Sequence, residues 1–178
     1  MTEKILVTGG AGFIGSHTCI ELLNNGNEVV VVDNLYNANK KSLEVVERVT
    51  GKKVTFYEAD IRDEAKLDEI FEKEGNIFGV IHFAGLKAVG ESCQLPLKYY
   101  DNNVAGTTTL CRVMEKHNCK NIIFSSSATV YGDPHALPIK EDFPLSVTNP
   151  YGRTKLITED ILKDVYKADN EWNIVLLR

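Results

Sequence analysis

Short apolar runs alternate along this chain with longer stretches in which apolar residues recur every three or four positions. The short runs have the length and composition of β-strands, and they cover residues 5–7, 28–32, 53–59, 79–84, 122–124 and 173–177. The longer stretches have helical spacing, and they follow the first run up to Leu23 and then cover residues 42–50, 63–73, 96–117 and 150–167. Asn149 and Pro150 are suited to cap and open the last helix. This alternation predicts an α/β fold with a parallel sheet and right-handed crossovers.

The first strand leads directly into a glycine-rich turn, TGGAGFIG at residues 8–15, and then into a helix. Gly9, Gly12 and Gly15 suit a tight turn, a close approach of backbone to a pyrophosphate, and close packing of helix on strand. Free N–H groups at the helix N-terminus would then face the phosphates. The pattern predicts a doubly wound parallel sheet, a Rossmann fold, with strand order 3-2-1-4-5-6 and ligands at the carboxyl ends of strands 1 and 4. A plain connecting turn is the alternative interpretation.

The second strand ends in Asp33, eighteen residues after Gly15. A dinucleotide-binding fold places a carboxylate there to accept hydrogen bonds from the adenosine ribose, and the same carboxylate would repel a 2′-phosphate. The two features together favour NAD over NADP as the cofactor. A carboxylate that only caps the end of the strand is the alternative.

Composition narrows the functional classes. The 178 residues are 43% hydrophobic, which is enough for one buried core, and the net charge of −5 is spread without a basic patch for nucleic acid. The start of the sequence lacks a signal-peptide pattern and no apolar run has membrane-spanning length, so we expect a cytoplasmic protein with no membrane partner. The four cysteines form no CxxC pair and have no neighbouring histidines at ligand spacing, so we expect reduced thiols and no metal site.

Tyr151 and Lys155 lie four positions apart on the predicted last helix and therefore share one face. A phenol ordinarily titrates near pH 10, and a neighbouring ammonium would lower its pKa into the range of a general base. Ser127, just after the fifth strand, could share or relay the proton. The same spacing also occurs in ordinary helices, and the serines could be simple turn residues. His82, within the fourth strand, fits a hydrogen-bonded core histidine better than a base.

Two segments interrupt the regular pattern. Asn102 and Asn103 are poor helix formers in the middle of the predicted helix 96–117, unless something requires their amides. Residues 132–149 hold four of the five prolines, which predicts an irregular, substrate-facing excursion.

Five segments in order, TGGAGFIGSH, FAGLKAVGES, YYDNNVAGT, FSSSATVYG and NPYGRTK, closely resemble the UDP-glucose 4-epimerase family of the extended short-chain dehydrogenase/reductase superfamily, and the resemblance runs over residues 1–178. It implies a catalytic set of Tyr151, Lys155 and Ser127. It also implies that the sugar contacts Lys87, Ser127 and Tyr151. The NAD contacts that the motifs and the resemblance together give are Gly9, Gly12, Phe13, Ile14, Gly15, Asp33, Asn34, Asp60, Ile61, Phe83, Ala84, Gly85, Lys87, Asn102, Tyr151 and Lys155.

The resemblance implies interconversion of UDP-galactose and UDP-glucose. Tyr151 would take the proton of the sugar 4-hydroxyl while C4 passes hydride to tightly held NAD⁺, and the 4-keto sugar would turn before hydride returns to its other face. The residues alone support only NAD-dependent oxidation of a secondary alcohol. Ala128 and Thr129 stand where related dehydratases carry an Asp-Glu pair, which disfavours dehydration. Another NAD-dependent nucleotide-sugar oxidoreductase and a non-catalytic NAD-binding module remain alternatives.

Chains of this family continue for nearly as long again and supply most of the nucleotide-sugar pocket. The run 173–177 looks buried on both faces, yet only Arg178 follows it. We therefore expect residues 1–178 to be an incomplete NAD-binding Rossmann domain that lacks the substrate-binding part, binds NAD weakly and does not turn over alone. The full-length protein is expected to be a homodimer that pairs through the helices 96–117 and 150–167.

Overall fold

The predicted apolar runs all form strands of one sheet. The computed structural model describes residues 2–178. In this range the strands are β1 (Lys4–Thr8), β2 (Glu28–Asp33), β3 (Thr55–Glu58), β4 (Gly79–His82), β5 (Asn121–Ser125) and β6 (Asn173–Leu177). They are all parallel and lie in the order β3-β2-β1-β4-β5-β6, which confirms the predicted Rossmann topology. The order reverses between β1 and β4, as the ligand-site prediction requires.

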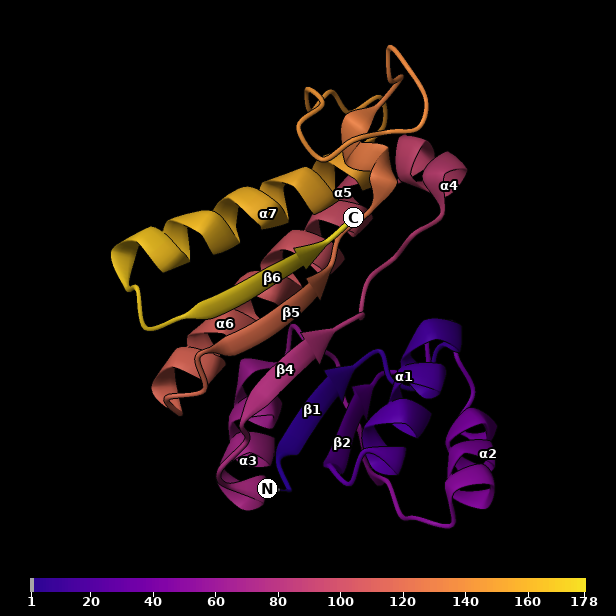
Figure 1. The fold of residues 1–178 in the computed structure, drawn as a ribbon, viewed down its shortest axis with the longest axis vertical. Helices are drawn as coiled ribbons and strands as arrows, with labels where there is room; N and C mark the ends of the chain where they lie inside the picture. The colour runs from indigo at the N-terminus through magenta and orange to yellow at the C-terminus, as the bar shows by residue number, and fades with distance from the viewer. Residues whose placement is uncertain (1) are drawn as a thin grey trace.

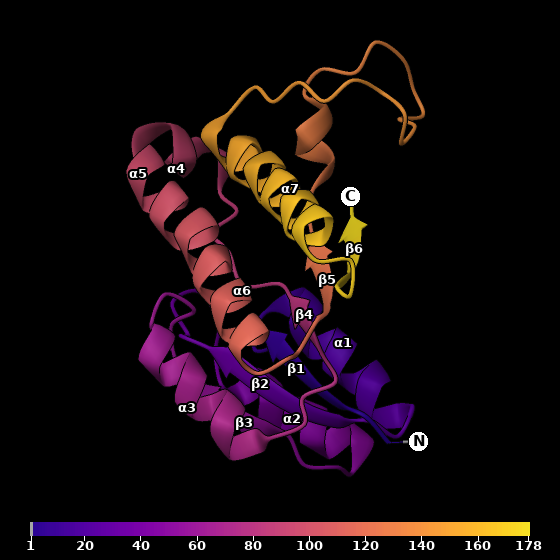
Figure 2. The ribbon, with the colours of Figure 1, turned by 90° about the vertical axis from the view of Figure 1, so that its left-hand side faces the viewer.

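Helices cover the two faces of this sheet unequally (Figures 1 and 2). The α-helices are α1 (Phe13–Asn24), α2 (Lys41–Thr50), α3 (Glu64–Glu74), α4 (Val89–Gln94), α5 (Pro96–Tyr99), α6 (Gly106–Lys116) and α7 (Pro150–Ala168). A π-helix, η1 (Tyr100–Ala105), joins α5 to α6, and a 3-10 turn, η2 (Ala128–Tyr131), follows β5. α1 and α2 cover one face, whereas α3, α6 and α7 cover the other.

Side-chain alternation along the strands supplies a core on each face. Leu6 and Phe124 belong to the core beneath α3, α6 and α7. Val7 and Val31 belong to the core beneath α1 and α2. Because both sets are almost fully buried, the central strands read as continuous apolar runs, as expected of a parallel sheet.

The last strand is covered on one face only. Ile174 and Leu176 pack against the core beneath α7, but Val175 is 48% exposed and Leu177 is 51% exposed. The described residues therefore cover one of the two faces that the apolar run was expected to bury. The core beneath α1 and α2 draws side chains from β1 to β4 but none from β6, and β6 lies uncovered at the front of Figure 1.

The helix predicted over 96–117 is not one regular α-helix. It is divided into α5, η1 and α6, and the π-helical turn contains both Asn102 and Asn103. The short α4 and η2 were not predicted, since neither is long enough to give a periodic pattern. Residues 132–149 form no helix or strand and project from the end of the molecule as an irregular loop, as predicted (Figure 1, orange).

Candidate active site

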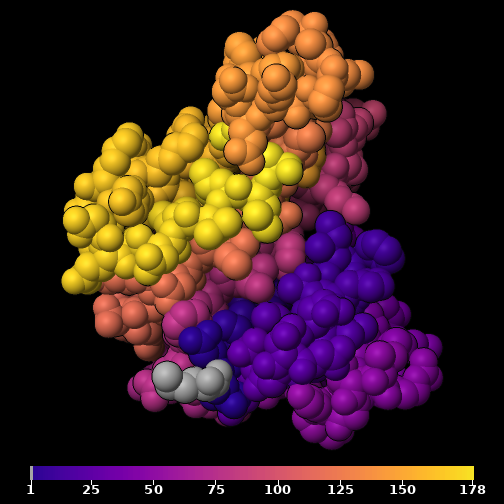
Figure 3. Space-filling view, in the orientation of Figure 1, coloured from indigo at the N-terminus to yellow at the C-terminus, as the bar shows by residue number. Residues whose placement is uncertain are grey.

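A cavity of about 450 Å³ opens at the carboxyl ends of β1 and β4. Its walls come from the glycine turn, the ends of β2 and β3, the segment after β4, the serines after β5 and the first turns of α7. The space-filling view shows the surface hollowed between the α1 region and α4 (Figure 3). The lining residues are Gly9, Gly12, Phe13, Ile14, Gly15, Val32, Asp33, Asn34, Tyr36, Asn37, Ala59, Ile61, Phe83, Ala84, Gly85, Leu86, Lys87, Asn102, Ser125, Ser126, Ser127, Tyr151 and Lys155.

The glycine turn is shaped by close backbone contacts. Gly9 has φ +69°, and a Cβ placed there would lie 2.7 Å from the nitrogen of Ala84. A Cβ on Gly15 would lie 2.3 Å from the carbonyl oxygen of Gly9. The first intrahelical bond runs from the Ser16 N–H to the Gly12 carbonyl at 2.9 Å, so the N–H groups of the residues between them precede it. The turn thus leaves backbone N–H groups at the cavity that could hold an anion, and a larger residue there would displace backbone.

Asp33 is fixed at the end of β2 by two backbone donors. Its carboxylate accepts from the N–H of Ala11 at 3.1 Å and from the N–H of Leu35 at 2.8 Å. The side chain is buried and faces the cavity. A carboxylate has about four acceptor sites, so two remain for the hydroxyls of a bound ribose.

Asp60 does not line the cavity, although its neighbours Ala59 and Ile61 do. Its carboxylate is engaged by Arg62, which donates to both oxygens, and by the Asn34 amide at 3.0 Å. These bonds, with that of Arg62 foremost, hold the pKa of the carboxyl well below its usual range. Asp60 therefore braces the wall through Asn34, and its contact with NAD stays a prediction.

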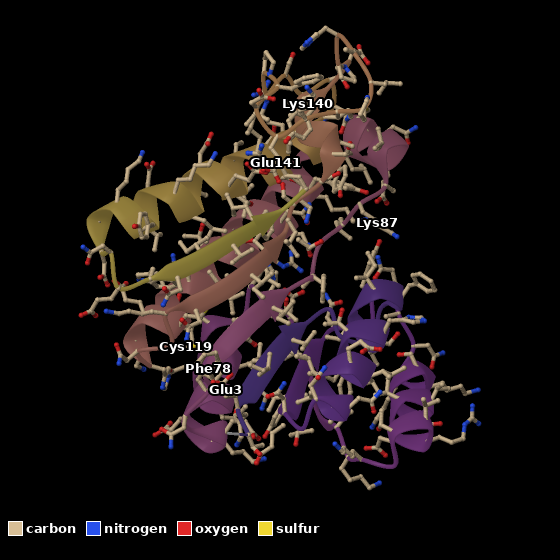
Figure 4. The ribbon with its side chains drawn as sticks, in the orientation of Figure 1. Glu3, Phe78, Lys87, Cys119, Lys140 and Glu141 are labelled. Atoms are coloured by element: carbon tan, nitrogen blue, oxygen red, sulfur yellow. The ribbon has the colours of Figure 1, made fainter. Side chains whose placement is uncertain are left out.

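The segment after β4 is held by its neighbours on both sides. The Ala84 N–H donates to Thr8 Oγ1 at 3.2 Å, and the Leu86 N–H donates to Asn103 Oδ1 at 2.8 Å. The Asn103 amide in turn donates to the Leu86 carbonyl at 2.9 Å. Lys87 follows and projects from the segment that joins β4 to α4, beside the α1 end of the cavity (Figure 4).

His82 is a fully hydrogen-bonded core residue. The hydroxyl of Thr107 donates to the Asn103 carbonyl at 2.6 Å, so it must accept from His82 Nε2 at 2.9 Å. His82 Nδ1 then accepts from the Thr8 hydroxyl at 2.6 Å. Burial lowers the pKa of the imidazole to about 3, so it is neutral and carries its proton on Nε2.

Tyr151 and Lys155 lie on the cavity side of α7. The helix begins after Asn149, whose side chain accepts from the N–H of Gly152 at 2.8 Å. Lys155 is buried, its Nζ donates to the Ser125 carbonyl at 2.7 Å, and burial lowers the pKa of its ammonium to about 8. The predicted i,i+4 pair is thereby brought into the same cavity as the glycine turn.

The serines after β5 differ in their roles. The Ser127 hydroxyl oxygen accepts from the Thr129 N–H at 3.2 Å and from the Thr129 hydroxyl at 2.9 Å, which leaves its own hydrogen free to donate. Ser126 instead donates to the buried carboxylate of Glu159 at 2.5 Å. Ser127 is therefore the one of these two whose proton is available to a ligand.

Except for Asp60, the structure brings every predicted site residue to the cavity wall. Leu86, Ser125 and Ser126 also line the cavity, within the segments 83–87 and 125–127 that the strand order predicts at this crevice. The lining residues that sequence reasoning did not name are Val32, Tyr36, Asn37 and Ala59. Val32 and Ala59 are direct neighbours of predicted residues and could have been included by continuity. Tyr36 and Asn37 lie in a polar loop without a periodic signal, so no pattern singled them out. No helix in the described part of the chain has the length and apolar character needed to cross a membrane.

Comparison with known proteins agrees with this geometry. Residues 5–178 match the model of the NAD dependent epimerase/dehydratase family. The UDP-glucose 4-epimerases of Dictyostelium discoideum and Bacillus subtilis are each 62% identical to the chain, over 99% and 98% of its length and 51% of theirs. The structure of UDP-glucose 4-epimerase from Bifidobacterium longum in complex with NAD⁺ and UDP superposes with a TM-score of 0.96 at 59% identity, covering 98% of this chain and 52% of that one. The chain spans about half the length of the curated relatives it matches. It belongs to the NAD dependent epimerase/dehydratase family.

Proposed function

We propose that residues 1–178 are the NAD-binding Rossmann domain of a UDP-glucose 4-epimerase, which interconverts UDP-galactose and UDP-glucose. The observation that carries the proposal is that Tyr151, Lys155 and Ser127 line one cavity with the glycine turn and Asp33. The relatives named UDP-glucose 4-epimerase support the substrate class, because they match the chain over 98% or more of its length. The domain would need a second part, as in those relatives, to complete the sugar site.

The residues present fit NAD. The turn at Gly9 and Gly15 leaves no room for a Cβ, so only backbone N–H groups can meet a pyrophosphate there. Asp33 keeps acceptor capacity for ribose hydroxyls and would repel a 2′-phosphate. Bound NAD would supply a hydride acceptor at the sugar C4 and, in the reverse direction, a hydride donor.

The chain's own residues supply the proton chemistry. Tyr151, as phenolate, takes the proton of the sugar 4-hydroxyl and later returns it. The ammonium of Lys155, on the same face of α7, stabilises the phenolate through its opposite charge. The Ser127 hydroxyl, with its hydrogen uncommitted, donates to the sugar oxygen or to the phenolate.

The finer assignments follow from the same proposal. The residues that would hold the cofactor are Gly9, Gly12, Phe13, Ile14, Gly15, Asp33, Asn34, Asp60, Ile61, Phe83, Ala84, Gly85, Lys87, Asn102, Tyr151 and Lys155. Lys87, Ser127 and Tyr151 would contact the sugar nucleotide. We also propose a cytoplasmic homodimer that pairs through α5–α6 and α7, which light scattering of the full-length protein would test.

The test uses full-length protein and UDP-galactose without added cofactor, followed by NMR. We expect UDP-glucose to form without net NADH, and Tyr151→Phe to lower the rate by at least about 100-fold. The matched control is Tyr166→Phe, because Tyr166 is on the same helix and 51% exposed, away from the cavity lining. Release of NADH with each turnover would instead identify a nucleotide-sugar dehydrogenase. Unchanged turnover in Tyr151→Phe would remove this residue from the role of base.

A further inference from the structure

Tyr36 links the wall of the cavity to α5. It lines the cavity from the connection that follows β2, and its hydroxyl accepts a hydrogen bond from Lys98 Nζ at 2.7 Å. Lys98 is 62 positions away, on α5, beyond the end of β4. Since β2 and β4 flank β1 on opposite sides, this contact connects the two halves of the fold across the point where the strand order reverses.

The Lys98 end of this contact is anchored. The ammonium also donates to Glu91 Oε1 at 2.9 Å, and the other oxygen of Glu91 accepts from the Tyr99 hydroxyl at 2.7 Å. Tyr99 is fully buried, and its hydroxyl oxygen accepts from the Ala88 N–H at 3.1 Å. Hydrogen bonds to Tyr36 and Glu91 raise the pKa of Lys98 to about 12, so the donor stays charged at neutral pH.

The Tyr36 end is held far more loosely. The residue is 61% exposed and follows Leu35, which has φ +55°. Its N–H donates to the Asn34 side chain at 3.1 Å, while its hydroxyl is joined to Lys98. An exposed ring on a turn, fastened at its tip to an anchored ammonium, can swing away at the cost of little more than that one bond.

We propose that Tyr36 and Lys98 form a latch across the mouth of the cavity, which must open for NAD to enter and to leave. The inference rests on the proposed NAD binding and concerns cofactor exchange. An epimerase returns its hydride to the substrate in every cycle, so it needs no exchange of cofactor between turnovers. Slow exchange through a latched mouth suits that chemistry.

A latch has a kinetic signature that an ordinary binding contact lacks. Loss of a contact made only to bound ligand raises the dissociation rate and weakens affinity. Loss of a latch raises the association and dissociation rates together, because both passages require it to open, and leaves the Kd nearly unchanged. A general loss of structure would not speed association.

The experiment measures NADH fluorescence by stopped flow in full-length protein, with association followed against NADH concentration and dissociation followed after mixing with excess NAD⁺. Tyr36→Phe removes only the hydroxyl, and Lys98→Met removes the charge. Tyr166→Phe and Lys167→Met are matched controls, because both residues are exposed on α7 away from the cavity lining.

We expect both rate constants to rise about 3- to 10-fold in Tyr36→Phe, with the Kd within about twofold of the unmodified protein, as loss of one hydrogen bond to a charged donor permits. The double variant should gain no more than the larger single effect, since either change opens the same latch. Unchanged exchange rates in Tyr36→Phe, or faster dissociation with unaltered association, would overturn the latch while leaving NAD binding intact. If the unmodified protein binds neither NAD⁺ nor NADH, the proposed function fails as well.

Discussion

Lys155 should make the folded protein less stable at neutral pH than an apolar side chain would. Its side chain is buried, and burial lowers the pKa of the ammonium from 10.5 to about 8. At about 1.4 kcal/mol per pKa unit, keeping the charged form in the folded protein costs about 3 kcal/mol. Lys155→Met removes that cost but leaves the Ser125 carbonyl without its donor, which costs about 1 kcal/mol. We therefore expect the variant to be more stable by about 2 kcal/mol, or about 4–8 °C in melting temperature.

The pH dependence of this difference follows from proton linkage. Below the folded-state pKa of about 8, Lys155 is charged in both the folded and unfolded states, so the full cost is present. As the pH rises toward the unfolded-state value of about 10.5, the folded state loses its proton first, and the stability of the unmodified protein increases. The advantage of Lys155→Met should therefore be largest near neutral pH and shrink above about pH 8.

Urea unfolding of both proteins across this pH range is the assay, with Lys167→Met as control. Lys167 is exposed on the same helix and pairs with Asp164 at 2.9 Å, so its replacement should change stability by less than about 1 kcal/mol, since exposed pairs contribute little. The same Lys155→Met protein should bind NAD poorly, which would separate stability from function. A variant that is less stable near neutral pH, or a difference that does not vary with pH, would refute the reasoning that Lys155 is held as a costly buried cation.

Three further outcomes are expected. Gly15→Ala places a Cβ 2.3 Å from the Gly9 carbonyl oxygen and should lower the free energy of unfolding, measured in urea, by about 2–4 kcal/mol. The control Gly90→Ala places a Cβ that meets nothing within 4 Å and should leave stability unchanged or raise it. Equal effects of the two substitutions would contradict the crowding at the glycine turn. His82 should remain the neutral Nε2–H tautomer over the whole pH range in which the protein is folded, because burial lowers its pKa to about 3. The ¹⁵N NMR signals of the imidazole check this. A titration midpoint near the ordinary histidine pKa would contradict the burial of the ring. Cys93 is exposed, whereas burial raises the thiol pKa of Cys19 and of Cys111 to about 12. A maleimide should therefore label Cys93 first in the folded protein. Faster labelling of either buried thiol would contradict this expectation.

The parts of the site that the sequence predicted share one property. In the glycine turn, at Asp33 and in the Tyr151–Lys155 pair, a local spacing dictates the geometry, because strand ends and helix faces place residues without reference to distant contacts. The direction of the Asp60 side chain depends on Arg62 and Asn34, which the spacing does not encode. The exposed face of β6 is not encoded either, since an apolar run does not report which face the helices cover.

Tyr36 and Lys98 show why contacts between distant segments could not be predicted from the sequence. Tyr36 is in a polar loop with no period, and Lys98 is one of many charged residues on short helices. Only the assembly of the sheet, with β2 and β4 on either side of β1, brings their polar groups within 2.7 Å across 62 positions. A long-range contact between a loop and a short helix leaves no pattern in a single sequence, whatever its part in function.

Asn103 is a residue whose local propensity and tertiary contacts oppose each other. Its presence in the middle of a helix is unfavourable by propensity, and the structure provides the compensation. The buried amide bonds both backbone groups of Leu86 at 2.8 and 2.9 Å, and it donates to the Thr154 hydroxyl at 3.0 Å. Thr154 donates to the carbonyl of Tyr151 at 2.7 Å, so one side chain ties the wall segment after β4 to the first turn of α7. The local conflict with helix propensity, resolved as the π-helix η1, therefore marks the point where the two walls of the cavity are held in register.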